Sequence, residues 1–443
     1  MLIEFSVGNY RSFWSTVTLS MQAAKLRSGD KTVDANSVFE MNGLRLLRSA
    51  AIYGANASGK SNLVRAMAFM RRFVLQSSKE SQSGEPIEVE RFRLNTAAGE
   101  SPAYFQIIFD LDGRRYRYGF ELDNQRVRTE WLYRTVQREV RLFIREGDQY
   151  NISGAFKEGQ GLQERTRPNA LFLSVAAQFN ASLAIALLEW FRTKFNTISG
   201  LNDDTYGGFT LNRFEADTTF RDRVLGFVRQ ADLGISDIRI ETRPISESHI
   251  PDEVRLVIEE ITKRREKQSN GRSLDSNIQI HHVTTSHPVF DQDHHAAGSE
   301  IFDMGDQESE GTQKIFLLSG PLLDTLDNGT VLVIDEMEAR LHPLITRTII
   351  SLFNSLQTNP HNAQLVFVTH DTGLLNSRFF RRDQIWFAEK DRYGATDLYS
   401  LAELQVRNDA SFDKDYIAGK YGAVPFIGGL HSLFEDEPDG ETI

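Results

Sequence analysis

Residues 54–61 form the octet Gly54-Ala55-Asn56-Ala57-Ser58-Gly59-Lys60-Ser61. The octet follows a short apolar strand expected over 46–53, and it precedes a helix expected over 62–74 from its apolar spacing. It matches G-x-x-x-x-G-K-[ST], in which glycines let backbone N–H groups face phosphate oxygens. Lys60 is then expected to reach the β- and γ-phosphates, and Ser61 to bind Mg²⁺. A glycine turn with an incidental lysine is the alternative, and the flanking strand and helix favour the phosphate loop.

A second motif ends a buried strand. Val331–Ile334 is wholly apolar, and Asp335 and Glu336 follow it directly. P-loop proteins place their second Mg²⁺ contact at the carboxyl end of such a strand, so Asp335 is the expected metal ligand. Glu336 would then be the general base that activates water. The alternative is a strand that ends in an acidic turn.

A histidine follows the next strand along the chain. A strand is expected over Leu365–Thr369, and His370 comes directly after it. A helix expected over 343–356 separates this strand from Val331–Ile334, which predicts a parallel βαβ unit with both strand ends at one sheet edge. A lone histidine is more often structural, but this spacing places His370 where it could polarise the γ-phosphate.

The rest of the chain alternates between β and helical patterns. Residues 103–122 alternate as a hairpin with a turn at Asp112-Gly113, and further strands are expected through Phe143. The remaining elements are expected as follows: an N-terminal strand followed by a turn within Met1–Phe13, helices over Ala181–Trp190 and Phe220–Val228, a strand over Asp237–Thr242, a charged helix over 252–268, a polar loop to about 300, and a helix over 312–326.

These elements predict an α/β P-loop NTPase with a parallel or mixed core sheet. We expect residues 1–95 and 301–430 to form the two halves of this ATPase, with 96–165 as an antiparallel β layer inserted between them. Residues 166–300 are expected to form a helical lobe with a polar insertion, and 431–443 an acidic tail.

Composition excludes several classes of protein. The chain has 443 residues, a formal net charge of −11 and no cysteine, so disulfide scaffolds, Cys-ligated metal sites and Cys nucleophiles are excluded. No apolar run approaches the length of a membrane span, and the N-terminus lacks the layout of a secretory signal. We therefore expect a cytoplasmic protein without membrane partners.

The order of these motifs resembles the ATP-binding cassette class of ATPases, and Asn9-Tyr10-Arg11-Ser12-Phe13 resembles its RecF and SMC branch. The resemblance implies that Arg11 approaches the nucleotide. It also implies that Glu308–Gln313 is a divergent signature motif, whose Ser309 and Gly311 contact the γ-phosphate held by a partner subunit. An ordinary helix N-cap at Ser309 or Thr312 is the alternative. Glu338–Pro343 falls at the position of the D-loop, and Pro343 also suits the first position of a helix.

Over most of residues 1–430, the chain resembles the RloA-like ATPases of bacterial abortive-infection and phage-defence loci, which are related to the OLD family. The similarity includes the motifs above and Gly422–Phe426. OLD proteins continue into a Toprim nuclease, and residues 371–443 are too few for one, so we expect any effector nuclease or toxin to be a separate chain.

The resemblance implies ATP and Mg²⁺ as cofactors and a homodimer or higher even oligomer, because this class closes each site between two cassettes. Glu336, His370 and Lys60 are the expected catalytic residues, and Ser61 and Asp335 the metal ligands. The expected nucleotide contacts are Arg11, Gly54, Ala55, Asn56, Ala57, Ser58, Gly59, Lys60, Ser61, Asn62, Ser309 and Gly311. The predicted function is a nucleotide-gated ATPase of antiphage defence that controls an effector. The alternatives are a RecF-like DNA-repair ATPase and a protein-interaction scaffold with little ATPase activity.

Three weaker patterns leave alternatives open. Five histidines within 281–295 suit either a metal site or a solvated hairpin. Nine arginines within 114–145, interleaved with aromatic residues, suit nucleic acid, a protein partner or a solvated strand face. The helix expected over 252–268 suits a coiled-coil stub or a packed surface helix.

Overall fold

The computed structural model of the chain describes residues 1–443 apart from 29, 81, 204–205, 232–233, 245–278, 408–409 and 426–443. The helix expected over 252–268 and the acidic tail expected over 431–443 lie outside the described residues. Among the described residues, no single helix has the length and apolarity needed to cross a membrane. The helices Phe172–Gln178 and Ser182–Thr193 have that length and apolarity only together, as a pair bent by 110°.

A six-stranded sheet lies at the centre of the molecule. Its first five strands are parallel, and β18 pairs antiparallel with β17. In spatial order the strands are β11 (Phe195–Ser199), β15 (Val331–Asp335), β16 (Gln364–Val368), β5 (Ser49–Tyr53), β17 (Ile385–Lys390) and β18 (Thr396–Ser400). The predicted parallel pairing of the strands before Asp335 and His370 is confirmed, since β15 and β16 are neighbours.

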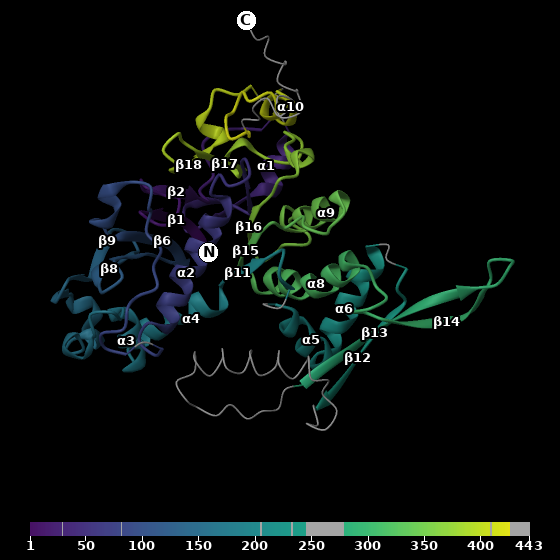
Figure 1. Cartoon of the computed structure of the whole chain (residues 1–443), viewed down its shortest axis with the longest axis horizontal. Helices are drawn as coiled ribbons and strands as arrows, with labels where there is room; N and C mark the ends of the chain where they lie inside the picture. Colours follow the sequence, from purple (N-terminus) through teal and green to yellow (C-terminus); the bar gives the residue numbers. More distant parts are fainter. Residues whose placement is uncertain are drawn as a thin grey trace, which may run out of the picture.

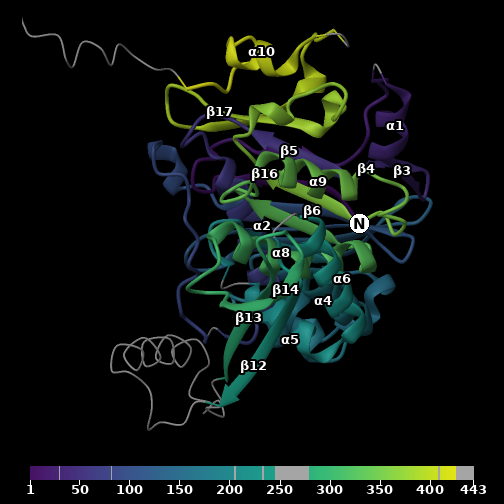
Figure 2. The ribbon, with the colours of Figure 1, turned by 90° about the vertical axis from the view of Figure 1, so that its right-hand side faces the viewer.

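Both faces of this core sheet are buried, which explains its unbroken apolar strands. Val331 and Val333 belong to one hydrophobic cluster, and Leu332 and Ile334 to another. The first cluster joins the core sheet to an antiparallel sheet through helices α2 (Lys60–Gln76) and α4 (Ser182–Thr193). The second cluster packs α8 (Glu310–Asn328) and α9 (Pro343–Phe353) on the opposite face. Figures 1 and 2 show this layered arrangement.

The antiparallel layer has seven strands, and it includes the N-terminus of the chain. In spatial order the strands are β10 (Gln149–Ile152), β9 (Glu139–Glu146), β8 (Val127–Thr135), β7 (Arg114–Leu122), β6 (Ala103–Leu111), β1 (Leu2–Gly8) and β2 (Val17–Ser20). The hairpin expected over 103–122 is confirmed, and its turn residues Asp112 and Gly113 have positive φ angles of 52° and 76°. Because β1 and β2 belong to this sheet, the β layer is continuous with the N-terminal segment.

The remaining elements surround these two sheets. The helices are α1 (Lys31–Ser37), α3 (Phe172–Gln178), α5 (Gly207–Ala216), α6 (Thr218–Gln230) and α10 (Phe412–Ile417), and β3 (Val38–Met41) pairs with β4 (Leu44–Leu47). Short 3₁₀ helices are η1 (Thr96–Gly99), η2 (Gly154–Gly159), η3 (Gln163–Arg165), η6 (Thr372–Leu374), η7 (Arg382–Gln384) and η8 (Leu401–Glu403).

A three-stranded antiparallel sheet includes the strand expected over Asp237–Thr242, and its other two strands lie in the segment expected as a polar loop before residue 300. It consists of β12 (Asp237–Pro244), β13 (Gln279–Phe290) and β14 (Ala296–Asp303). The hairpin of β13 and β14 projects from the body of the molecule beside α6 (Figure 1). The expectation of a loop was wrong because the side chains of β14 are nearly all exposed, so its composition carries no apolar alternation.

Three other expectations need correction. The strand expected over 46–53 is two strands, separated at Arg48, whose buried guanidinium donates to Asn36 O, Val38 O and Asn362 Oδ1. The helix expected over 343–356 ends at Phe353. The helical lobe expected over 166–300 contributes β11 to the core sheet, a strand whose sequence FNTIS is too short and polar to be recognised alone.

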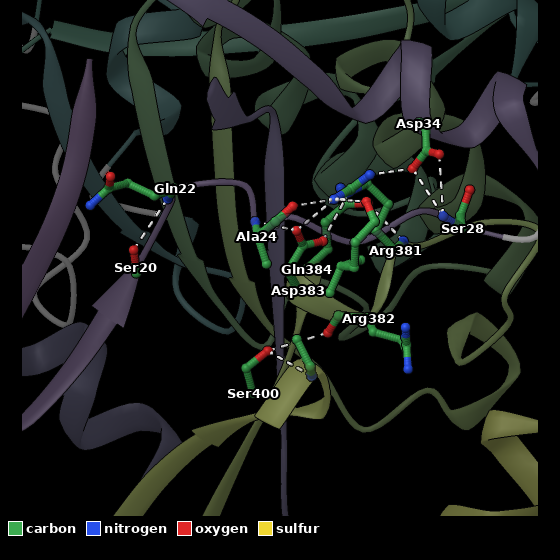
Figure 3. A network of polar contacts seen from close by, with 12 residues as sticks. Ser20, Gln22, Ala24, Ser28, Asp34, Arg381, Arg382, Asp383, Gln384 and Ser400 are labelled. Carbon is green, nitrogen blue, oxygen red and sulfur yellow. Dashed lines mark hydrogen bonds and ion pairs between the residues drawn. The ribbon is translucent and has the colours of Figure 1, made fainter. Parts of the chain in front are cut away.

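Buried polar contacts tie the segment after β2 to the C-terminal half. Arg381 is almost completely buried, and its guanidinium donates to Asp34, to both oxygens of Asp383, and to the carbonyls of Ala24 and Leu26 (Figure 3). Gln384 beside it donates to Ser49 at the start of β5. This network holds Ala24, Leu26 and Asp34 beside the strand that leads to the phosphate loop.

Candidate functional site

The three predicted motifs meet at one edge of the core sheet. The octet 54–61 follows β5, Asp335 ends β15, and His370 lies two residues beyond the end of β16. Since β15, β16 and β5 are parallel neighbours, their carboxyl ends lie together. The structure therefore brings Lys60, Ser61, Asp335, Glu336 and His370 to a single site.

The backbone of the octet has the conformation that its glycines predict. Gly54, Ala57 and Gly59 all have positive φ angles, of 153°, 61° and 108°. A Cβ on Gly54 would lie 2.3 Å from Ala388 O, and one on Gly59 would lie 2.2 Å from Thr396 Oγ1, so neither position has room for a side chain. Asn56 and Ala57 are exposed at the tip of the loop. Gly59 begins α2 without a side-chain cap, which leaves the helix N-terminus directed at the loop.

Lys60 is buried beneath this loop. Its ammonium donates to Gly54 O and Ala55 O, both at 2.8 Å. Burial lowers the pKa of Lys60 to about 8, although Asp335, Glu336 and Glu338 favour its charged form. The cation is thus held at the base of the phosphate loop with less water around it than a surface lysine has.

Ser61 and Asp335 form the predicted pair of oxygen ligands. Ser61 Oγ donates to Asp335 Oδ1 at 3.0 Å. Burial raises the pKa of Asp335, and the hydrogen bond from Ser61 opposes that shift. A hydroxyl and a carboxylate side by side suit Mg²⁺, which prefers oxygen ligands.

Glu336 and His370 follow the neighbouring parallel strands β15 and β16. Glu336 has a φ of 52°, in the left-handed region that non-glycine residues adopt at a cost. The side chain of His370 is exposed, yet local desolvation followed by the charge of Lys60 lowers its pKa. The imidazole is therefore neutral at pH 7 and able to both donate and accept a hydrogen bond.

Glu338 is a site residue that sequence reasoning assigned only to the D-loop. Its Oε1 accepts the backbone N–H of His370 at 2.5 Å, which joins the loop after β15 to the loop after β16. Its Oε2 is shielded from solvent and has no hydrogen-bond partner among the described residues. A third carboxylate, after Asp335 and Glu336, therefore belongs to the site. The sequence did carry a signal for this carboxylate, because Glu338 lies only two residues after Glu336.

The N-terminal motif contacts the octet through Ser12. Ser12 Oγ accepts from Asn62 Nδ2 at 2.9 Å, and Ser12 O accepts from Thr396 N at 2.7 Å. Thr396 Oγ1 in turn donates to Ser58 O at 2.7 Å. The side chain of Arg11, the predicted nucleotide contact, instead forms an ion pair with Glu90. Thr396 was missed because nothing in the sequence relates β18 to the octet, and Ser12 was named only as part of its motif, with no role.

Two observations test whether this site fits nucleotide phosphates. Ser58 is buried in the loop, and its Oγ has no hydrogen-bond partner among the described residues. The glycine positions form a cradle in which any Cβ would collide with neighbouring atoms. Together with the buried ammonium of Lys60, these features fit a phosphate chain bound by backbone N–H groups.

The segment predicted as the signature begins α8. Ser309 is its N-cap, with Oγ accepting the N–H of Thr312 at 3.1 Å, so the N-cap alternative is confirmed and remains compatible with a role in binding. Ser309 and Glu310 are exposed. Gly311 adjoins the D-loop, since a Cβ there would lie 2.9 Å from Arg340 O. At the other end of the D-loop segment, Pro343 is the first residue of α9, as predicted.

The histidines of 281–295 do not converge on one point. His281 pairs with Glu215, His282 with Asp303, and His287 with Glu308. At the exposed hairpin tip, Asp291, Asp293 and His295 have ligand atoms within 4.8 Å of one another. Of the two interpretations of residues 281–295, a metal site or a solvated hairpin, the structure has the hairpin.

Several of the arginines of 114–145 are engaged within the chain. Arg117, Arg126 and Arg128 form ion pairs with Glu139, Asp148 and Asp123, respectively. Arg145 is completely buried and donates to Ala170 O. Such pairing within one sheet reduces the charge available to an external phosphate backbone.

Several solved structures are similar to this chain. The SMC head domain from Thermotoga maritima is 12% identical, with a TM-score of 0.39 over 91% of this chain and 99% of that chain. The SmcHead bound to the C-winged helix domain of ScpA is 13% identical, with a TM-score of 0.42 over 90% and 97%. RecF with ATP, the recombination mediator of the RecFOR pathway, is 13% identical, with a TM-score of 0.34 over 90% and 99%. No curated protein matches the chain.

A family model matches residues 49–376, which is most of the chain. The match includes the octet, the segment before α8, the carboxylates after β15 and His370. The predicted fold class, an α/β P-loop NTPase with a mixed core sheet and an antiparallel β layer, is confirmed by this match and by the sheets described above. The chain belongs to the family described as "AAA domain, putative AbiEii toxin, Type IV TA system".

Proposed function

We propose that the chain binds Mg²⁺ and ATP at Gly54–Ser61 and hydrolyses ATP in a site completed by a second copy. The observation that supports this most is the convergence of Lys60, the Ser61–Asp335 pair, Glu336 and His370 at one sheet edge. Mg²⁺, when bound, neutralises charge on the phosphate oxygens.

The residues divide the chemistry among them. The backbone of the loop and Lys60 bind the phosphates, and Ser61 and Asp335 hold the metal. Glu336 takes the proton of the attacking water, and neutral His370 donates a hydrogen bond to the terminal phosphate. Glu338 orients His370 through its backbone N–H.

A second copy is part of the proposal because each chain has one signature segment and one octet. Ser309 and Glu310 are exposed at the start of α8, where they can contact another molecule. In a symmetric pair, the signature of each chain would complete the site of the other, which gives two equivalent sites.

A mixing experiment tests this arrangement. Lys60→Ala removes phosphate binding from one chain, and Ser309→Arg blocks the signature of another. Each variant alone should be inactive. Mixed dimers should regain up to half of the wild-type ATPase rate, since one of their two sites has an intact octet and an intact signature. If both variants are inactive alone and mixing restores nothing, the shared site is wrong.

We further propose that this ATPase is a nucleotide-gated sensor or scaffold in antiviral defence, acting on a separate effector chain. The support is the description of its family, which names a toxin and a toxin–antitoxin system. Phage plating on cells with the wild-type locus, with a deletion and with Glu336→Gln tests this role. Unchanged plating after deletion would reject it, and protection by Glu336→Gln would favour a scaffold that needs no hydrolysis.

A further inference from the structure

Lys314 is a buried cation that the proposed chemistry does not use. It lies in the second turn of α8 and is completely buried. Its ammonium donates to three backbone carbonyls, those of Gly200 at 2.7 Å, Met337 at 3.1 Å and Ala339. An ammonium has three N–H groups, so these bonds use all of them.

The burial of this charge is costly. Burial lowers the pKa of Lys314 to about 8, although Asp203 and Glu338 favour the charged form. No ion pair joins Lys314 to a carboxylate of the described residues. Its neighbours Ile315 and Phe316 are buried and apolar, so this turn of α8 would accept an apolar side chain. Replacing a buried charge by an apolar residue is often neutral or stabilising, which makes stability a poor reason for Lys314.

The three carbonyls belong to the segments that determine where Glu336 points. Met337 and Ala339 lie in the loop after β15, between Glu336 and Arg340, both of which have left-handed φ angles. Gly200 N donates to Asp335 O at 2.6 Å, and a Cβ on Gly200 would lie 2.1 Å from Glu336 O. Two strained residues stay in such a loop only when surrounding contacts hold them. Lys314 supplies three of those contacts.

The same helix begins with the signature segment. Glu310 in its first turn forms an ion pair with Arg340 at 3.3 Å, and Gly311 adjoins Arg340 O. The first turn of α8 therefore contacts the end of the loop, and Lys314 in the second turn contacts its middle. We propose that Lys314 is the positioning residue that holds the Glu336 loop of its own chain in its catalytic conformation, from the helix that offers the signature to the partner. This inference rests on the proposed ATPase activity.

Lys314→Met tests the proposal by steady-state kinetics of the full-length protein. It keeps the length and burial of the side chain and removes the three hydrogen bonds. We expect kcat to fall about a hundredfold, the scale of a misplacement near 1 Å, while the KM for ATP and the melting temperature change little. Lys194→Met is the matched control, because Lys194 Nζ also donates to a carbonyl, Asn328 O at 3.1 Å, outside the site. An unchanged kcat, or equal losses in kcat and ATP affinity, would overturn the proposal.

Gly200→Ala serves if Lys314→Met does not fold, since it displaces the same loop from its other side without removing a charge. It should likewise lower kcat and spare KM. A normal kcat for Gly200→Ala would contradict a catalytic role for this loop conformation.

Mixed dimers separate positioning from a general effect on α8. In the mixed dimer, the Ser309→Arg chain supplies the octet and Glu336 of the active site, and the Lys60→Ala chain supplies only the signature. Lys314→Met should therefore lower the activity far more when it is added to the Ser309→Arg chain than when it is added to the Lys60→Ala chain. Equal losses in the two chains would show that Lys314 merely stabilises the helix. If the mixture without Lys314→Met is inactive, the shared site fails while the kinetic test of Lys314 still stands.

Discussion

Lys60 and Lys314 are both buried lysines whose pKa is lowered to about 8, and both donate to backbone carbonyls. They differ in what surrounds them. Lys60 lies under a loop whose glycines leave room for a ligand, whereas Lys314 has all three N–H groups bound to carbonyls of its own chain. The first is placed to bind phosphate, and the second to hold a loop.

The pKa of Lys60 predicts how ATP binding depends on pH. Below pH 8 the ammonium is charged and attracts phosphate. Above pH 8 it loses its proton in the free protein, so binding must restore that proton, and the association constant should fall about tenfold per pH unit. Calorimetry from pH 7.5 to 9.5 measures this, with adenosine as a control ligand that has no phosphate. A constant ATP affinity up to pH 9.5 would contradict this role of Lys60.

Residues of the site that lie within one motif could be predicted from the sequence. Lys60, Ser61, Asp335 and Glu336 follow from local patterns with known chemistry. Ser12, Thr396, Gly200 and Lys314 could not be assigned a role, because their roles arise from contacts between segments far apart in the chain. The resemblance implied that Arg11 contacts the nucleotide. Its motif adjoins the octet, but the side chain of Arg11 forms an ion pair with Glu90.

At the scale of elements, the buried parallel strands were the most predictable part of the fold. Their continuous apolar sequences agree with burial on both faces. The short strand β11 and the exposed strand β14 could not be recognised, because neither has an apolar pattern of its own. The sequence also could not predict which strands share a sheet. Only the structure shows that β1 and β2 extend the layer of β6–β10.

The network around Arg381 predicts a change in stability without a change in chemistry. Arg381→Met removes the guanidinium partner of the buried carboxylate of Asp383 and of the half-buried carboxylate of Asp34, so the free energy of unfolding should fall by about 3 kcal/mol. Urea denaturation measures this change. Arg378→Met, at an exposed arginine nearby, should cost far less. Equal stabilities of the two variants would show that the network contributes little.

The pairing of the arginines on β7 and β8 predicts weak DNA binding by this layer. Arg117 forms an ion pair with Glu139 and stacks on Tyr133 at 4.1 Å, so an external phosphate would have to displace both. The double variant Arg114→Ala, Arg117→Ala should change affinity for duplex DNA less than about tenfold at physiological salt. Tight binding with a steep salt dependence that this variant abolishes would instead favour the RecF-like alternative.

At the scale of the whole molecule, one chain supplies half of each proposed site. The octet and the carboxylates after β15 lie at the carboxyl edge of the core sheet, and the exposed signature residues begin α8. Two copies would bury both halves around ATP. Binding and hydrolysis would then change the assembly, and an effector could respond to that change.

The measurement that tests this account most directly is the solution mass of Glu336→Gln by light scattering, with and without Mg-ATP. Removal of the base should preserve ATP binding and prevent hydrolysis, so the closed pair accumulates. We predict a monomer without ATP and a mass that doubles with ATP, and Glu100→Gln, at an exposed carboxylate remote from the site residues in sequence, should show no such trapping. A Glu336→Gln protein that binds ATP and remains monomeric would contradict the account.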